Sequence, residues 1–380
     1  MKCVKNIFLT VWLVIVAFSS SNAQIVPVSD SVINPFQVVI TGDAAFHYFV
    51  EDTVKYTYEM IEEDIYYFQK HWPQYVTVKT IGKSEFGLPL TSFRISNGKP
   101  KSNAVFYVGN IHAREDFSSK MVMKFANVFL LSLDSLSNIY PNAKSLLNEV
   151  DLHFLPVANP DGLKIAHEQF GGIEDSVKLW KDSIYCLETF AEWKANARGI
   201  DLNSSFDDGN WLVKRGGAFQ DCRASEGFKG NFPAEPTETK AIQTFVDSLK
   251  PLTTVSFHTK GNVLFWADNK THAWFNGIDT EMATEVEKET ELRAGSVAKY
   301  PSDYGCGLEN YVRNRFAGIG VCVELSDGGG GRKQHPDNQF NTQVWMKAWR
   351  IPMIYLENTI EHQEQLRTIQ QLMQKSIQTN

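Results

Sequence analysis

The stretch Asn110–Glu115, with the sequence NIHARE, follows directly on the apolar run Ala104–Val108. That run has the length and composition of a buried β-strand. The side chains of His112 and Glu115 are three residues apart, so they can turn toward one point from a single tight bend. Because ligands of α/β proteins bind beyond the carboxyl ends of strands, we interpret this bend as the start of a functional site.

Strand and helix patterns alternate along the rest of the chain. The helical pattern of Tyr58–Trp72 is expected to be capped by Thr53 and to end at Pro73. The other expected strands are 76–81, 90–95, 152–157, 253–257, 263–266 and 318–325, and the other expected helices are 118–131, 235–249, 279–297 and the chain from about 342 onward. This alternation predicts an α/β fold, a single domain with a mixed, largely parallel sheet flanked by helices.

The composition fits a globular protein. The chain has 380 residues, of which 43% are hydrophobic, so it can build a substantial core and is not disordered throughout. Its formal net charge of −7 argues against a nucleic-acid partner, because proteins that bind nucleic acids usually carry a basic patch. No internal repeat or break in composition marks a second domain.

The N-terminus has the features of a secretory signal peptide. Two lysines precede the apolar run Ile7–Phe18, and small residues lead to an expected cleavage after Ala23. The run is short for a membrane span, no later segment is apolar enough for one, and a buried N-terminal helix is the alternative interpretation. We expect residues 1–23 to be a signal peptide and 24–52 a lead-in, too short for an inhibitory prodomain. The mature protein is expected to be secreted or periplasmic.

Removal of the signal peptide would leave four cysteines, which allow three pairings. Export permits disulfides. We favour Cys186–Cys222, in a loop-rich stretch, with Cys306–Cys322 as the second expected pair. None of the cysteines forms a CxxC pair, so a zinc–thiolate site is not expected.

Three further segments place polar side chains at or near strand ends. His258 ends an apolar strand, Gly199–Asn203 presents a carboxylate and an amide, and Glu324 lies inside the apolar run Val321–Leu325. A carboxylate in such a run is costly to bury unless it is paired or close to a metal; the alternative is an edge strand with Glu324 facing water. Zinc hydrolases commonly hold their metal through two histidines and one glutamate, with a fourth position open for water. The histidine and glutamate of NIHARE, together with His258, match that set.

These segments, in this order, resemble the zinc metallocarboxypeptidase family from about Tyr56 to Leu325. The resemblance also covers Ile81–Ser84, Gly87–Pro89 and Pro156–Gly162. It implies a single α/β domain with a twisted mixed sheet, one Zn²⁺ per chain and peptide substrates. Residues 53–380 would then form a zinc peptidase catalytic domain with a C-terminal helical segment.

Matching the motifs assigns roles to individual residues. By this resemblance, His112, Glu115 and His258 are the zinc ligands, Glu324 is the general base that takes a proton from the attacking water, Asp201 orients the first histidine, and Arg114 and Asn203 position the substrate. The division of labour is chemically consistent. Zinc lowers the pKa of water and polarises the scissile carbonyl, while a neighbouring carboxylate accepts the proton and delivers it to the leaving nitrogen.

The chain departs from the family pattern at three positions. In the exopeptidases, an arginine after the Asp-Leu-Asn segment clamps the terminal carboxylate of the substrate; Ser204 stands there, and Arg198 cannot be assumed to replace it. Lys194 stands where the family has an arginine that helps to stabilise the oxyanion. A lysine keeps the positive charge but lacks the planar guanidinium group with its two parallel donors. The tyrosine expected upstream of the general base has no clear match: Ser302 falls at the ungapped position, and Tyr304 is the nearest candidate.

Two segments narrow the resemblance to one branch of the family. Trp193–Asn203 and His258–Gly261, followed by Trp266, resemble the bacterial γ-D-glutamyl diamino-acid (diaminopimelate) peptidases, which cut the stem peptides of peptidoglycan. The peptidases of this branch similarly lack the arginine clamp. By position, Glu309 would line the primary specificity pocket of the family, and an acid there would favour a lysine or the free amine of a diamino acid. A solvated glutamate on the helix that begins near Leu308 is the alternative.

The resemblance therefore predicts an exported zinc peptidase that hydrolyses an amide bond in stem peptides. The expected substrate-binding residues are Asn203, Ser204, Tyr304 and Glu309. A metallocarboxypeptidase that releases C-terminal basic residues is the first alternative, and Ser204 counts against it. A low-activity zinc-binding scaffold is the second, but it would have lost Glu324 or a ligand, and all four are present. We expect a monomer with a peptide or stem-peptide substrate and no nucleic-acid partner.

Overall fold

The computed structural model describes residues 55–99, 101, 103–170, 190–215, 219–328 and 335–378. The expected signal peptide, the lead-in and Cys186, with its expected pairing to Cys222, therefore lie outside the described residues. None of the described helices is both long and apolar enough to cross a membrane.

One mixed sheet runs through the described chain. Its strands are β1 (Val76–Lys83), β2 (Pro89–Ile95), β3 (Ala104–Val108), β4 (Asp151–Leu155), β5 (Thr253–Thr259), β6 (Val263–Phe265), β7 (Arg293–Ala294) and β8 (Ile319–Leu325). They lie in the order β1-β2-β4-β3-β5-β8-β6-β7. The central strands β4, β3, β5 and β8 are parallel to one another, whereas β2 joins β4, and β6 joins β8, in the antiparallel sense. The predicted mixed, largely parallel sheet is confirmed.

Helices separate most of the strands, as the alternating sequence pattern predicts. The α-helices are α1 (Tyr58–His71), α2 (Asp116–Leu133), α3 (Ala143–Leu146), α4 (Pro160–Ala166), α6 (Thr237–Leu249), α7 (Ile278–Glu289), α8 (Pro301–Tyr304), α9 (Leu308–Phe316), α10 (Met346–Ala348), α11 (Ile351–Glu361) and α12 (Gln363–Gln378). Short 3₁₀ turns are η2 (Phe190–Glu192), η3 (Leu202–Ser204), η4 (His272–Phe275) and η5 (Asp337–Gln339), and η6 (Asn341–Trp345) is a π-helical turn.

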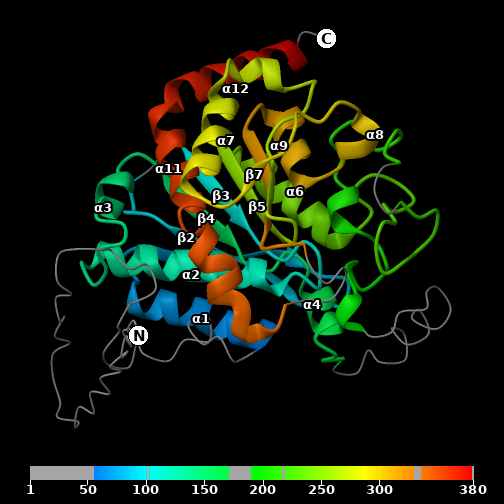
Figure 1. Cartoon of the computed structure of the whole chain (residues 1–380), viewed down its shortest axis with the longest axis horizontal. Coiled ribbons are helices and arrows are strands. Elements are labelled where there is room, and N and C mark those ends of the chain that lie inside the picture. Colours follow the sequence, from blue (N-terminus) through cyan, green and yellow to red (C-terminus); the bar gives the residue numbers. More distant parts are fainter. Residues whose placement is uncertain are drawn as a thin grey trace, which may run out of the picture.

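Helices cover both faces of the sheet (Figure 1). Val105 and Tyr107 of β3 belong to the larger core, with residues of α1, α2, α7 and α11, whereas Phe106 and Val108 belong to a second core with α6 and α9. Successive side chains of a strand point to opposite faces. Because both faces of β3 are covered, the strand is apolar throughout, which is the pattern that identifies it in the sequence.

Two expected element ends are wrong. Thr57, rather than Thr53, caps α1, and its side chain accepts a hydrogen bond from the backbone N–H of Met60. The helix expected over 279–297 ends at Glu289, because the chain beyond it is drawn into the sheet edge as β7. There the N–H of Arg293 donates to the carbonyl of Asn262 at 3.1 Å.

The expected Cys306–Cys322 disulfide is also wrong. Both residues are buried and unpaired, and they lie in different surroundings. Cys322 is in the middle of β8, where its sulfur lies within 4.8 Å of ligand atoms of His258 and Glu324. Cys306 precedes α9, and its N–H donates to Asp208 Oδ2 at 3.0 Å.

Thiol labelling checks this correction. Protein denatured without a reductant should take up iodoacetamide at both Cys306 and Cys322, because neither sulfur is held in a bond with the other. Peptide mass spectrometry should find these two residues modified to the same extent in a sample that was reduced first. A Cys306–Cys322 cross-linked peptide in the unreduced digest would contradict the fold at this point.

Candidate metal centre and active site

The bend between β3 and α2 is built to present His112 and Glu115. Asn110 adopts a left-handed backbone conformation with φ of 51°, and its side-chain amide donates to the carbonyls of His112 at 3.2 Å and Ala113 at 3.1 Å. Gly109 precedes it, and a Cβ there would lie 2.8 Å from the carbonyl oxygen of Pro156. The sharp turn therefore depends on a glycine for close approach and on a side-chain amide that closes the loop.

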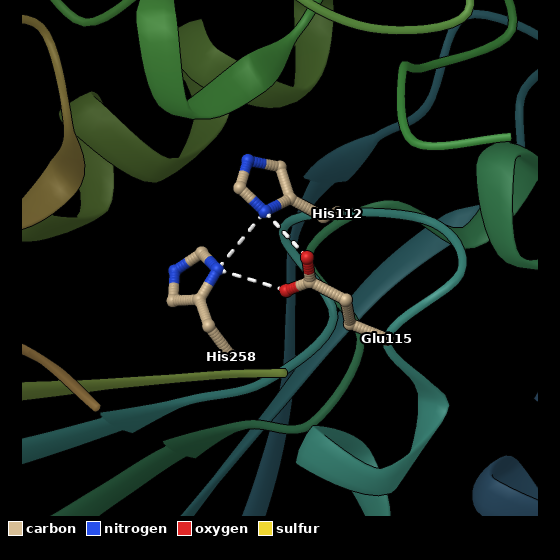
Figure 2. Close-up of side chains that lie close together, drawn as sticks. All are labelled: His112, Glu115 and His258. Carbon is tan, nitrogen blue, oxygen red and sulfur yellow. Dashed lines mark hydrogen bonds and ion pairs between the residues drawn. The ribbon is translucent and has the colours of Figure 1, made fainter. Parts of the chain in front are cut away.

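Three side chains converge where β3 and β5 end. Figure 2 shows His112, Glu115 and His258 turned toward one another. His112 Nδ1 lies 3.0 Å from Glu115 Oε1, His258 Nδ1 lies 3.0 Å from Glu115 Oε2, and the two Nδ1 atoms are 3.0 Å apart. All three residues are buried. The structure thus brings together the three predicted metal ligands.

The other ring nitrogens of the two histidines have partners of their own. His112 Nε2 lies 3.2 Å from Asp201 Oδ1, and Asp201 Oδ2 accepts a hydrogen bond from the N–H of Gly227 at 3.1 Å. His258 Nε2 lies 3.0 Å from Ser256 Oγ. These partners favour the tautomers that carry the proton on Nε2. Both Nδ1 lone pairs then face the Glu115 carboxylate and each other.

Three electron-pair donors held this close repel one another unless a cation lies between them. Tetrahedral zinc with bonds of about 2.0–2.1 Å places its ligand atoms roughly 3.3 Å apart, close to the separations seen here. Burial raises the pKa of Glu115, but the two imidazoles outweigh it and hold that pKa well below its usual range. The site therefore offers two imidazoles and one carboxylate, a set that fits Zn²⁺.

The general base candidate stands beside the ligands in the sheet. In the parallel pair β5–β8, His258 is opposite Glu324 and Ser256 is opposite Cys322, so the four side chains share one face. The alternative in which Glu324 faces water from an edge strand is wrong, because β8 is paired on both sides. Burial, and next the charge of Glu115, raise the pKa of Glu324. A carboxylate whose pKa is raised is a better proton acceptor near neutral pH than an ordinary glutamate.

Lys194 brings positive charge to the same place. Burial lowers its pKa, but the carboxylates of Asp201, Glu115 and Glu324 reverse the effect and leave the pKa raised, so the ammonium stays charged. Its position is fixed by the backbone: the carbonyl of Lys194 accepts from the N–H of Ala113 at 3.0 Å. The loop that carries the lysine is thus hydrogen-bonded to the bend that carries two ligands.

A residue that was not among the predicted site residues, Asn159, ties these two loops together. In the sequence, Asn159 stands out only as part of the segment Pro156–Gly162 that resembles the family, but its buried side-chain amide donates to the carbonyls of Ile111 at 3.2 Å and Ala195 at 3.1 Å. Its oxygen accepts from the N–H of Gly162 and caps α4. The Asn-Pro-Asp-Gly pattern signals the cap, but not the two long-range bonds.

Arg114 and Arg198 point to different partners. Arg114 donates to the carbonyl of Glu192 at 2.8 Å and to Glu226 Oε2 at 3.1 Å; Glu226 is a second residue that the sequence analysis did not single out. Arg198 pairs with Glu85 at 3.4 Å. Arg198 therefore does not take the place of the missing arginine at Ser204.

The predicted substrate-binding residues gather around the start of α9, with one exception. Asn203 Oδ1 accepts from the N–H of Leu308 at 3.1 Å, and Ser204 ends the 3₁₀ turn that carries Asn203. Glu309 lies in the first turn of α9. The side chain of Tyr304 has no hydrogen bond to another predicted site residue in the described part of the chain; burial, followed by Asp268, raises its pKa to about 12.

Glu309 is held in place rather than solvated. Its carboxylate folds back over Gly307, where a Cβ would lie 2.1 Å from Oε1. Its Oε2 is enclosed and has no hydrogen-bond partner among the described residues. Burial raises the pKa of this carboxyl group. The alternative of a freely solvated surface glutamate is therefore wrong, because the carboxylate is packed against the chain at the start of α9.

Zinc affinity tests the orienting role of Asp201. In Asp201→Asn the carboxylate charge beside His112 Nε2 is lost, so the affinity for Zn²⁺, measured by competition with a chromophoric chelator, should fall on the order of 10- to 100-fold. Asp207→Asn is the matched control, because Asp207 is exposed on the same segment and its variant should bind like the wild type. Unchanged affinity in Asp201→Asn would remove Asp201 from the metal centre.

Several known proteins are similar to this chain in sequence or in fold. The γ-D-glutamyl-L-diamino acid endopeptidase 1 of Lysinibacillus sphaericus is 26% identical over 304 residues, which cover 78% of this chain and 71% of that protein. Carboxypeptidase A1 of Sus scrofa is 24% identical over 338 residues, 80% of this chain and 71% of that protein. The crystal structure of thrombin-activatable fibrinolysis inhibitor, 16% identical, has the same fold, with a TM-score of 0.64 over 83% of this chain and 78% of that one.

A family model decides the assignment. The model described as zinc carboxypeptidase matches residues 61–351. The match spans all three converging side chains, Glu324, and the sheet from β1 to β8. The chain therefore belongs to the zinc carboxypeptidase family, whose members use one zinc, and it is a zinc metallopeptidase.

Proposed function

We propose that this peptidase is exported and hydrolyses the bond between γ-D-glutamate and a diamino acid in peptidoglycan stem peptides. The observation that carries the proposal is Ser204. An exopeptidase needs a cation that clamps the terminal carboxylate of its substrate, and here a short neutral side chain stands at that position. The described arginines closest to Ser204 in sequence each lie beside a carboxylate: Arg198 pairs with Glu85 at 3.4 Å, Arg215 lies 4.0 Å from Asp221, and Arg223 pairs with Glu235 at 3.2 Å.

Two further observations support this substrate. The enclosed Oε2 of Glu309 lacks a hydrogen-bond donor among the described residues, and the free amine of a diamino acid is a donor of the right charge. The L. sphaericus relative, matched over more than two thirds of its length, is named for cleavage at such a residue. The N-terminal sequence, with its lysines, apolar run and small residues, supports export to the compartment in which stem peptides are found.

The residues of the chain divide the reaction among them. When bound, zinc lowers the pKa of water and polarises the scissile carbonyl. Glu324 takes the proton of the attacking water and passes it to the leaving nitrogen. The Lys194 ammonium offsets the charge that develops on the carbonyl oxygen. Arg114 and Asn203, each anchored by hydrogen bonds, position the peptide for the reaction.

A carboxypeptidase specific for basic residues is the second candidate. The carboxylate of Glu309 favours it, because an acid attracts the side chain of lysine or arginine as well as a diamino acid. Ser204 opposes it for the reason given above. A binding scaffold without activity is opposed by Glu324 and the intact ligand set.

Digestion of purified muropeptides by the mature, zinc-loaded protein, followed by mass spectrometry, tests the proposal. The products should end at γ-D-glutamate, with the diamino acid and everything after it released. Glu324→Gln should lower the rate by at least about 100-fold, because the variant cannot accept the water proton, while zinc content stays the same.

Other outcomes of the digestion separate the candidates. Intact muropeptides together with trimming of peptides that end in lysine would refute the stem-peptide proposal in favour of the basic carboxypeptidase. Zinc-loaded protein that cleaves neither substrate would favour the scaffold.

A further inference from the structure

Lys214 is an ammonium group without a carboxylate partner in the described structure. It follows Ser204 on the loop that leaves the active site, and its Nζ donates to the carbonyl of Asp303 at 2.7 Å. Among the described residues, no carboxylate lies within ion-pair distance of it. A half-buried lysine satisfied only by a carbonyl retains donors for an anion from outside the chain.

A short chain of contacts links Lys214 to Glu309. Asp303, which accepts from Lys214, precedes Tyr304 at the end of α8. In the orientation that satisfies both ends of its amide, the Asn310 side chain donates to the carbonyl of Tyr304 at 2.6 Å and to Glu309 Oε1 at 3.1 Å. Lys214 is thus held on the carbonyl of Asp303, and Glu309 is joined through the Asn310 amide to the carbonyl of the next residue, Tyr304. The charge of Lys214 acts on the Glu309 carboxyl group and favours a lower pKa there, although no ion pair joins the two side chains.

The loop that carries Lys214 is firmly built. Lys229 is buried, donates to the carbonyls of Trp211 at 2.5 Å and Lys214 at 3.1 Å, and lies 4.2 Å from the centroid of the Trp211 ring. The N–H of Arg215 donates to the carbonyl of Ser302 at 3.0 Å. These bonds fix the backbone on both sides of Lys214, so that little conformational entropy is lost when it binds a ligand.

We propose that Lys214 binds a carboxylate at the end of the same substrate side chain whose amine Glu309 binds. The enzyme then selects a diamino acid that ends in both an amine and a carboxylate over one that ends in an amine alone. This inference rests on the proposed function. The contacts through Tyr304 and Asn310 tie Lys214 to Glu309. We therefore assign Lys214 to the carboxylate on the side chain of the substrate residue, and not to the main-chain carboxylate of that residue, which would lie near Ser204.

Matched peptides provide the test. The probe is L-Ala-γ-D-Glu-diaminopimelate with both diamino-acid carboxylates free, compared with the same peptide amidated at the side-chain carboxylate, and with one amidated at the main-chain carboxylate. The wild type should cleave the free peptide with a kcat/KM about tenfold above that of the side-chain amide, as expected for loss of a charge-assisted hydrogen bond. Amidation of the main chain should change kcat/KM much less.

Three variants in the same loop separate the effect of Lys214 from that of net charge. Lys214→Met should bring the ratio of kcat/KM for the free peptide and the side-chain amide to about one, mainly through KM, and Lys214→Arg should restore part of it. Arg215→Met removes the same charge one residue away, where the side chain is exposed and lies beside Asp221 at 4.0 Å, and should keep the wild-type ratio. Melting temperature and zinc content should be the same in all three variants.

Each contrary result has a distinct meaning. Equal wild-type rates on the free peptide and the side-chain amide, a ratio unchanged by Lys214→Met, or a preference that depends on the main-chain carboxylate would each overturn the assignment of Lys214 while leaving stem-peptide cleavage intact. No cleavage of any of the three peptides by zinc-loaded wild type would overturn the proposed function and this inference with it.

Discussion

The meeting of two imidazole nitrogens and one carboxylate at a single point is the constraint on which the rest of this active site depends. It needs β3 and β5 to be adjacent and parallel, so that the bend carrying His112 and Glu115 and the end of the strand carrying His258 reach the same edge of the sheet. It also needs both Nδ1 lone pairs to be turned inward. Asp201 and Ser256 meet that need from outside the cluster.

Charge is balanced around this point by groups from several distant segments. Buried carboxylates are stable only where cations or hydrogen bonds offset their loss of water. Lys194 faces three of them, and in turn those carboxylates keep it protonated in surroundings that would otherwise lower its pKa. Asn159 couples the loop that carries Lys194 to the bend that carries two metal ligands, so that the positions of these two loops cannot change independently.

One departure from the family pattern and two charged side chains favour the same kind of substrate. A neutral residue, Ser204, stands at the position of a clamp for a terminal carboxylate. The Glu309 carboxylate on α9 and the Lys214 ammonium on the loop after Ser204 are connected through the segment from Asp303 to Asn310. A binding site that loses one fixed cation and presents a pair of opposite charges elsewhere is suited to a substrate residue whose charges lie at the end of its side chain.

The sequence by itself determined the fold class, the family and the ligand set. These rest on local patterns: an apolar strand covered on both faces, the His-x-x-Glu bend that follows it, and motifs in a fixed order. Only the tertiary structure decided which distant groups meet. It placed Glu324 in a central strand, enclosed Glu309 over Gly307, engaged Arg198 with Glu85 and separated Cys306 from Cys322. Strand order and register are set by the packing of the whole core, and a short stretch of sequence does not carry that information.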